Sequence, residues 1–372
     1  MSIIWHYICY MPIGKIIIEE GEKMWFLGNS QSDKGRVTDI ADSFHREKTQ
    51  KINTKPSVED LEQGFIHCDH CSEVIMLEDF KGLSIGRCPH CRTSMFFPML
   101  IKDYWLFEPL GGGGMGSVYH SFHRTNPDVE YAVKVLPRRK KNNKGLIESL
   151  MREAQIAWNL GEHQHITKVI DYGFENNEYF AVFEYIDGVR LDILIDSPIR
   201  KTEKKVLLWA LQILSAEQHI YDKGYLFRDL KPQNIMIDRR GNVKLVDFGL
   251  AMAIEDAIKG GRSQIQGSPY YIPPERIVGT GESQCSEIYS LGMVMFHILA
   301  QKPYYSAEDI KSLVCKHVTS LRVESVKRKL PDNVDSAIID ALSKMIARKP
   351  SSRYSTFKDA AKHLFKIYKE SA

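Results

Sequence analysis

A series of short motifs in a fixed order, spread over residues 110–275, narrows the fold of this chain more than any other property of its sequence. The first is a glycine-rich run flanked by strand-type residues. Its glycines follow the spacing G-x-G-x-x-G and are Gly111, Gly113 and Gly116. Glycines at this spacing let backbone amides approach phosphate oxygens without a clash from Cβ atoms. Many isolated glycine runs are only flexible loops, so the motifs that follow decide the interpretation.

The later motifs place a lysine, a glutamate and a group of acidic and amide residues in one order along the chain. They are Ala132-Val133-Lys134, Arg152-Glu153-Ala154, Phe227-Arg228-Asp229-Leu230-Lys231-Pro232-Gln233-Asn234, Asp247-Phe248-Gly249 and Pro273-Pro274-Glu275. Together these motifs resemble the signature of the protein kinases, over about residues 104–368. The form Asp-Leu-Lys-Pro-x-Asn and the glycine-rich run are similar to those of bacterial Ser/Thr protein kinases.

The resemblance implies a role for each polar residue in these motifs. Lys134, paired with Glu153, would hold the α- and β-phosphates of ATP, and Asn234 and Asp247 would bind Mg²⁺. Asp229 would accept the proton of the substrate hydroxyl, while Lys231 would neutralise charge on the transferred phosphoryl group. The implied activity is transfer of the γ-phosphoryl group of ATP to Ser/Thr hydroxyls of protein substrates.

The resemblance also indicates residues that would surround the nucleotide. Phe183-Glu184-Tyr185-Ile186 is similar to the gatekeeper and hinge, where backbone groups of Glu184 and Ile186 would bind adenine. The full implied nucleotide-binding set is Leu110, Gly111, Gly113, Gly116, Val118, Ala132, Lys134, Glu184, Ile186, Asn234 and Asp247. Glu275 and Arg353 are similar to a buried ion pair that anchors the activation segment, which is a structural role.

Two residues depart from the kinase pattern. Phe227 stands where a histidine normally precedes Arg-Asp, and Glu287 stands where an aspartate is normal. We expect Phe227 to keep an apolar contact with Phe248, and Glu287 to reach the backbone amides of the catalytic loop that the aspartate binds in the family. The alternative is a pseudokinase scaffold that binds ATP without efficient transfer, but every residue that would touch metal, phosphate or the substrate hydroxyl is present.

The segment between Asp247 and Glu275 contains no threonine. Ser263 lies there beside basic residues, and Arg228 is the kind of residue that pairs with a loop phosphate. We predict that Ser263 is an autophosphorylation site, and a solvated loop serine is the alternative.

Four closely spaced cysteines precede the kinase-like region: Cys68, Cys71, Cys88 and Cys91. Two C-x-x-C pairs at this separation are typical of a tetrahedral Zn²⁺ site, with each pair in a tight turn. The residues around them are too few to form a core without such a link, so we expect a closed, structural zinc ribbon. His67, His70 and His90 are alternative ligands, but four thiolates already complete the coordination.

The partner of the ribbon is predicted to be a protein. Arg87 and Arg92 flank the second cysteine pair, but Glu73, Glu78 and Asp79 oppose them, so no basic stripe for nucleic acid forms. The whole chain has a formal charge of only +3, which indicates neither a nucleic acid nor a membrane. No stretch has the length and hydrophobicity of a membrane helix or the features of a signal peptide, so we expect a cytoplasmic protein.

The chain has 372 residues, enough for two or three domains. We predict an N-terminal segment over 1–60 with a weak hairpin and a polar linker, a zinc ribbon over 61–98 and a kinase domain over 103–370. Within that domain, an N-lobe would span 103–186 and a C-lobe 187–370. The expected fold class is therefore α+β, a two-lobed protein kinase fold preceded by a small zinc ribbon.

Overall fold

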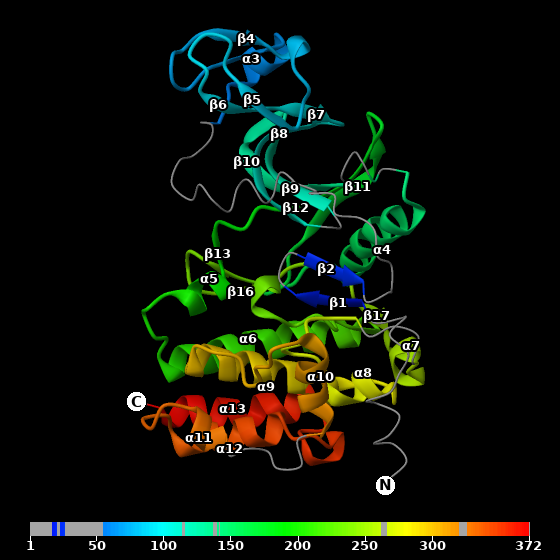
Figure 1. The fold of residues 1–372 in the computed structure, drawn as a ribbon, viewed down its shortest axis with the longest axis vertical. Helices are drawn as coiled ribbons and strands as arrows, with labels where there is room; N and C mark the ends of the chain where they lie inside the picture. Colours follow the sequence, from blue (N-terminus) through cyan, green and yellow to red (C-terminus); the bar gives the residue numbers. More distant parts are fainter. Residues whose placement is uncertain are drawn as a thin grey trace. The chain divides into compact units, whose positions relative to one another are not determined.

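The computed structural model describes residues 17–20, 23–26, 55–113, 116–136, 140, 142–261, 266–319 and 326–371, the first two stretches as backbone only (Figure 1). The chain forms two compact units. One comprises Met1–Gln31, Asn159–Thr167 and Ile186–Ala372, and the other comprises Ser32–Trp158 and Lys168–Tyr185. The predicted autophosphorylation site, Ser263, lies outside the described residues.

Near the N-terminus, two short strands form an antiparallel pair. They are β1 (Ile17–Glu20) and β2 (Lys23–Phe26), with Ile17 opposite Phe26. The polar linker expected after them, residues 29–55, lies outside the described residues except for Lys55.

The cysteine-containing segment begins with a short helix, α3 (Val58–Glu62), whose N-cap Ser57 accepts a hydrogen bond from the Asp60 N–H. Two small hairpins and one helical turn follow. They are β3 (Phe65–His67) with β4 (Val74–Met76), η1 (Leu77–Asp79), and β5 (Ser84–Arg87) with β6 (Ser94–Phe97). Each hairpin therefore carries one cysteine pair between its strands.

An antiparallel sheet of six strands follows directly, in the order β11-β12-β10-β9-β8-β7. Its strands are β7 (Met99–Ile101), β8 (Tyr104–Gly113), β9 (Gly116–His123), β10 (Asn126–Val135), β11 (Val169–Glu175) and β12 (Glu178–Glu184). Helix α4 (Lys144–Leu160) connects β10 to β11. The segment predicted to form the N-lobe thus contains this sheet, apart from β7, with one long helix between its strands.

The cysteine hairpins and the six-stranded sheet share one apolar core. Leu61, Ile66, Cys68, Ile75, Cys88, Met95 and Phe97 pack in one cluster with Trp105, Phe107 and Phe122 of β8 and β9. The Trp105 Nε1–H also donates to Glu62 of α3 at 3.1 Å, and Glu62 forms an ion pair with Arg124. The cysteine segment is therefore packed against the sheet as part of one unit, because its few residues bury their apolar side chains on β8 and β9.

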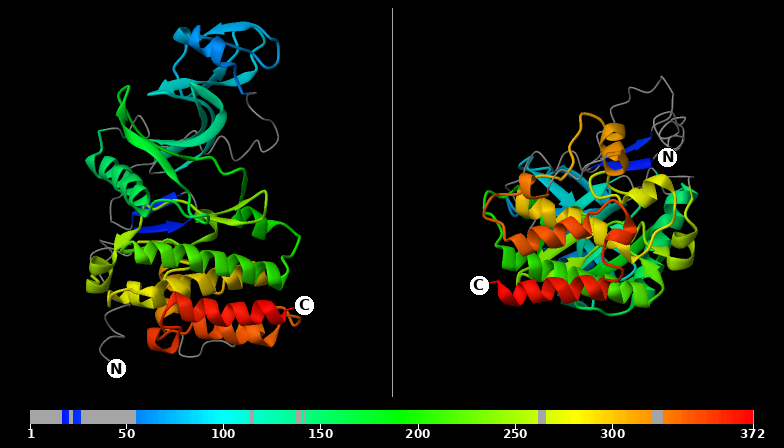
Figure 2. Two further views of the ribbon diagram at one scale, coloured as in Figure 1. Left: turned by 180° about the vertical axis from the view of Figure 1, so that it is seen from behind. Right: turned by 90° about the horizontal axis from the view of Figure 1, so that it is seen from below.

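The other unit is mainly helical. Its helices are α5 (Leu191–Asp196), α6 (Glu203–Asp222), α7 (Ile254–Lys259), α8 (Pro274–Val278), α9 (Gln284–Ala300), α10 (Ile310–Thr319), α11 (Val326–Lys329), α12 (Ser336–Met345) and α13 (Phe357–Glu370). Helix α9 is buried along nearly its whole length. Figure 2 shows α6, α9 and α13, in green, gold and red, lying side by side. Among the described residues, none of the helices combines the length and the hydrophobicity needed to cross a membrane.

Short strands and turns of this unit carry the polar motifs. The strands are β13 (Gly188–Arg190), β14 (Tyr225–Leu226), β15 (Ile235–Asp238), β16 (Val243–Leu245) and β17 (Met252–Ala253), with the turns η3 (Pro232–Asn234) and η4 (Pro350–Ser352). They pair as β13-β15-β16 and β14-β17. The catalytic-loop motif lies between β14 and β15, and the Asp-Phe-Gly motif lies between β16 and β17.

Candidate active site

Lys134 and Glu153 form a close ion pair within the sheet-containing unit. Lys134 lies on β10 between Val133 and Val135, and because both valines are buried on one face, the lysine side chain points to the other face. Its Nζ lies 2.9 and 2.7 Å from the two carboxylate oxygens of Glu153. Glu153 is 3% exposed, on the same face of α4 as buried Leu150 and Ala157.

The described glycines of the glycine-rich run lie at the end of β8 and the start of β9, with Gly111 opposite Val118 and Gly113 opposite Gly116. A Cβ atom at Gly116 would lie 3.2 Å from the Val135 carbonyl oxygen and 3.3 Å from the Lys134 Cγ. Such contacts are too tight for most side chains, so glycine at this position lets the hairpin lie directly against the lysine.

Asp229, Lys231 and Asn234 are joined in the helical unit, and all three are buried. Asn234 Nδ2 donates to the Asp229 Oδ2 at 2.7 Å and to the Asp229 carbonyl oxygen at 3.0 Å. Lys231 Nζ lies 3.0 Å from the same Oδ2. The turn η3 brings the asparagine back beside the aspartate, so one carboxylate is held by a cation and an amide.

Asp247 begins the Asp-Phe-Gly motif in a left-handed conformation, with φ 66°. Its Oδ1 accepts a hydrogen bond from the Gly249 N–H at 3.1 Å. Phe248 is fully buried and packs edge-to-face on Phe227, with ring centroids 5.3 Å apart. The predicted contact between Phe227 and Phe248 is therefore confirmed.

Glu287 binds the backbone of the catalytic loop, as predicted. Both of its carboxylate oxygens accept from the Arg228 N–H, at 3.0 and 3.1 Å. Arg228 has φ 66°, a left-handed conformation unusual for a residue with a side chain. From the other side, Arg276 Nη1 donates to the Arg228 carbonyl oxygen at 2.6 Å. The peptide groups just before Asp229 are thus held by two side chains from α8 and α9.

The side chain of Arg228 is also engaged. Its Nε and Nη2 lie 3.0 and 2.7 Å from Glu282 Oε1, and Glu282 Oε2 accepts from Arg276 Nε at 2.7 Å. Burial opposes the charge on Glu282, but the two arginines overcome it and lower the pKa of its carboxyl. Sequence reasoning missed both Arg276 and Glu282, because no motif includes them.

Glu275 and Arg353 form the expected buried ion pair, at 2.7 and 3.0 Å. Arg353 also donates to the carbonyl oxygens of Ala347, Cys285 and Arg348. Ser286 donates to the same Glu275 carboxylate at 2.6 Å. This pair ties α8 to the segment that precedes α13.

The remaining residues of the predicted nucleotide set are placed in separate parts of the chain. Leu110 is an exposed residue of β8, Val118 and Ala132 are partly buried on β9 and β10, and Glu184 ends β12. The Glu184 N–H donates to the Lys168 carbonyl oxygen at 2.9 Å. Ile186 follows just after and belongs to the helical unit.

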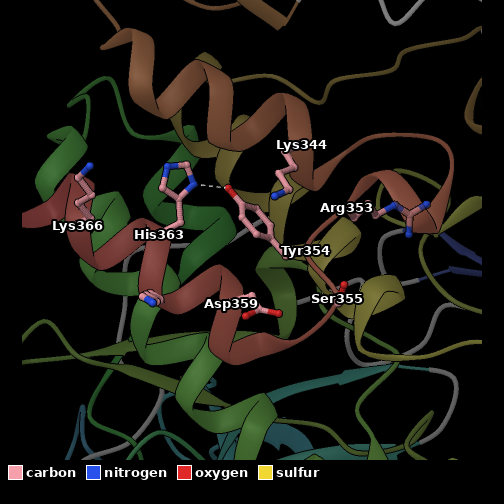
Figure 3. A pocket seen from close by; sticks show the side chains of 8 residues that line it. Lys344, Arg353, Tyr354, Ser355, Asp359, His363 and Lys366 are labelled. Carbon is pink, nitrogen blue, oxygen red and sulfur yellow. Dashed lines mark hydrogen bonds between the residues drawn. The ribbon is translucent and has the colours of Figure 1, made fainter.

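A hollow of about 580 Å³ lies between α12 and α13 (Figure 3). Figure 3 shows its lining side chains, among them Lys344, Lys366 and the hydrogen-bonded pair Tyr354 and His363. None of the predicted catalytic, nucleotide-binding or zinc-binding residues lines it.

The four predicted zinc ligands converge in the cysteine segment. All four Sγ atoms lie within 4.8 Å of one another, with 3.6 Å between Cys68 and Cys91 and 3.7 Å between Cys71 and Cys88. Both turns have the same hydrogen bonds, since the N–H groups of Ser72 and Arg92 donate to the carbonyls of Cys68 and Cys88. Ser72 and Arg92 both have positive φ, 57° and 63°.

Comparison with known proteins identifies the same part of the chain that carries the kinase-like motifs. Residues 104–366 match the family described as "Protein kinase domain". Serine/threonine-protein kinase PrkC of Bacillus subtilis is 34% identical over 256 residues, which cover 69% of this chain and 39% of the relative. Serine/threonine-protein kinase PknH of Mycobacterium bovis is 31% identical, over 72% of this chain and 44% of the relative. The chain therefore spans only about two fifths of the length of these relatives.

Proposed function

Because the chain belongs to the protein kinase family, we propose that it transfers the γ-phosphoryl group of ATP to Ser/Thr hydroxyls of protein substrates. The observation that carries this proposal is the arrangement around Asp229, whose carboxylate is held by Lys231 and Asn234 within hydrogen-bonding distance. A carboxylate that is fixed in this way can orient a hydroxyl group and accept its proton.

The other polar residues supply binding and charge neutralisation in this proposal. Lys134, fixed by Glu153, would hold the α- and β-phosphates, while the glycine hairpin would present backbone amides to them. Asn234 and Asp247 offer the amide and carboxylate oxygens that Mg²⁺ prefers. The bound Mg²⁺ would neutralise charge on the phosphates. Lys231 would stabilise the transferred group, and backbone groups of Glu184 and Ile186 would bind adenine.

The pseudokinase alternative remains a prediction with less support. This alternative rests on Phe227 and Glu287, which depart from the family pattern. Phe227 packs on Phe248, and Glu287 binds the Arg228 N–H with both oxygens, so both departures keep their expected contacts. Ser263 as an autophosphorylation site also remains a prediction. Arg228, which would bind its phosphate, forms an ion pair with Glu282.

The test is transfer of labelled phosphate from ATP with Mg²⁺, both to the protein itself and to a basic protein substrate. Wild type is compared with Asp229→Asn, Asp247→Asn and Glu153→Gln, and the control is Glu148→Gln, an exposed glutamate on the same helix as Glu153. We expect the first two variants to lose transfer by about 10²-fold or more, and Glu148→Gln to match wild type. Nucleotide binding without transfer in wild type would replace this proposal by the scaffold.

We further propose that the four cysteines bind one structural Zn²⁺. Four thiolates at about 2.3 Å from a tetrahedral zinc lie about 3.8 Å apart, close to the 3.6 and 3.7 Å between the sulfur pairs. A closed four-sulfur site leaves no position for a water molecule, so zinc would hold the fold and take no part in catalysis. Metal analysis of the purified protein should give one zinc per chain, and none in the Cys88→Ser variant.

The ribbon is proposed to bind a protein that recruits or regulates the kinase. Support comes from its mixed charges and from its apolar side chains Val74 and Met76, which are exposed on β4. We also propose a cytoplasmic location, in which the cysteines stay reduced. Affinity capture with the intact chain and with the double variant Val74→Ser/Met76→Ser tests the first proposal, and cell fractionation tests the second.

A further inference from the structure

A third buried glutamate, Glu217, lies close to Glu287, which holds the catalytic loop, and belongs to no kinase motif. It is on α6, 2% exposed, and α6 packs directly against α9, which carries Glu287. Neither carboxyl oxygen of Glu217 receives a hydrogen bond from a donor in the described part of the chain. A buried carboxyl group without a donor is costly when ionised, so its presence here requires a reason.

The charges around it supply that reason. Arg228 and Arg276 face Glu287 and Glu282, so two cations already balance two carboxylates among the described residues. Nearby charges are balanced too, because Lys231 pairs with Asp229 and Arg353 pairs with Glu275. An ionised Glu217 would add one buried negative charge without a partner.

A proton on Glu217 removes this excess charge and creates the missing donor. Both oxygens of Glu287 accept from the Arg228 N–H, which favours the ionised form of Glu287. The protonated carboxyl group of Glu217 can then donate to it. Burial raises the pKa of Glu217 well above its usual range, and the nearby charge of Glu287 and a hydrogen bond between the two side chains raise it further. Burial also raises the pKa of Glu287, but Arg276 and the Arg228 N–H oppose this effect and favour its ionised form.

We propose that Glu217 is a positioning residue for the catalytic loop: it holds a proton shared with Glu287, and this hydrogen bond keeps the Glu287 carboxylate on the Arg228 N–H, one residue before Asp229. The pair extends the anchor of the loop from α9 to α6. It also accommodates the longer side chain of Glu287, because the carboxylate gains a second fixed contact.

The first experiment measures unfolding as a function of pH and does not require catalysis. If folded Glu217 keeps its proton while unfolded Glu217 loses it above about pH 4.5, wild type loses stability as pH rises, relative to Glu217→Gln, which has no such proton. We expect the ratio of the wild-type unfolding constant to that of Glu217→Gln to rise about tenfold per pH unit between pH 5.5 and 7. A ratio that does not change with pH overturns the proposal. Glu370→Gln, an exposed glutamate of α13, is the control and should show no change in its ratio.

Infrared spectroscopy detects the proton directly. At pH 7.5 wild type should show the carbonyl band of a protonated carboxyl group, and Glu217→Gln should lack it. A band of equal size in both proteins overturns the assignment. If Glu217→Gln does not fold, Glu287→Asp is compared with the double variant Glu217→Leu/Glu287→Asp. The double variant should lose the pH dependence that the single variant keeps, and equal pH dependence in both would overturn the proposal.

The kinetic test rests on the proposed kinase activity, whereas the unfolding and infrared tests do not. At pH 7 Glu217→Gln, which keeps a donor, should retain kcat within about twofold. Glu217→Leu should lower kcat about tenfold, with KM for the peptide changed by less than about twofold, because the loop would be misplaced while binding remains. Equal kcat for Glu217→Leu and wild type would show that Glu217 does not position the loop.

Discussion

The cysteine turns and the catalytic loop both hold residues with side chains in left-handed conformations, but they do so by different means. At Ser72 and Arg92, the N–H groups donate to carbonyls four residues earlier in the same turns. At Arg228, the N–H group is held by Glu287, 59 residues away in the sequence. One region is therefore ordered by local hydrogen bonds and four sulfur atoms, and the other by side chains from distant helices.

The two regions offset the free-energy cost of their left-handed residues in different ways. A left-handed conformation costs roughly 1–2 kcal/mol for a residue with a Cβ atom. In the cysteine segment the core shared with β8 and β9 offsets that cost, and the proposed zinc would add to it. In the catalytic loop it is offset by buried charges, so substitutions far from the loop in sequence should affect it.

The largest effect should follow from removing the proposed zinc ion. Zinc sites of this type contribute roughly 10 kcal/mol or more to folding of small modules. Chelation, or Cys88→Ser, should therefore unfold the cysteine segment and expose the core around Trp105, while the catalytic loop stays ordered. Hydrogen exchange measured separately for residues 65–107 and 225–250 tests this. Cys285→Ser, a partly buried cysteine of α9, is the control. Equal loss of protection in both segments would contradict the conclusion that the two regions are ordered independently of each other.

Breaking the ion pair of Glu275 and Arg353 should have the next largest effect, now confined to the helical unit. Glu275→Gln leaves Arg353 buried without its counter-charge, which costs about 3–5 kcal/mol. The exposed pair of Asp256 and Lys259 offers a matched control, and Asp256→Asn should leave stability unchanged within error. Urea denaturation measures both. A small loss of unfolding free energy for Glu275→Gln would show that the charge of Glu275 contributes little. The hydrogen bonds of Arg353 and Ser286 would then hold this part of the fold.

Removing the Phe227 ring, which packs on Phe248 of the Asp-Phe-Gly motif, should lower the free energy of unfolding about as much as Glu275→Gln or slightly less. Phe227→Ala deletes a buried ring that packs on Phe248. Such deletions lower the free energy of unfolding by about 3–5 kcal/mol, and by less where the surrounding residues relax into the cavity. Phe365→Ala, at an exposed aromatic ring of α13, should change the unfolding free energy far less. If Phe227→Ala were as mild as its control, the catalytic loop would not depend on this contact.

The sequence predicts the two regions to different extents. The paired cysteines, the strand containing Lys134 and the helix containing Glu153 follow from short spacings and from alternating or helical periodicity. The roles of Asp229, Asn234 and Asp247 follow from resemblance. The contacts of Phe227 and Glu287 follow from the family contacts of the residues that they replace.

The network around Arg228 could not be predicted, because Arg276 and Glu282 meet it only through the tertiary fold. A signal did exist for Glu217. It lies four residues after Ile213 and three before Ile220, on the apolar face of α6, where a glutamate conflicts with the helical pattern. Such a conflict between local pattern and residue type is expected at functional positions. The core shared by the cysteine segment and the sheet was also missed, since length alone suggested a separate module.

The smallest predicted effect tests that shared core. Trp105→Phe keeps an aromatic ring in the cluster but removes the hydrogen bond from Nε1 to Glu62. Because Glu62 keeps its ion pair with Arg124, we expect a loss of only about 0.5–1.5 kcal/mol. Trp158→Phe, at an exposed tryptophan of α4, is the control. The loss should appear as faster hydrogen exchange in both the cysteine segment and strands β8 and β9, since they pack as one unit. Faster exchange in the cysteine segment alone would show that the ribbon folds independently of the sheet.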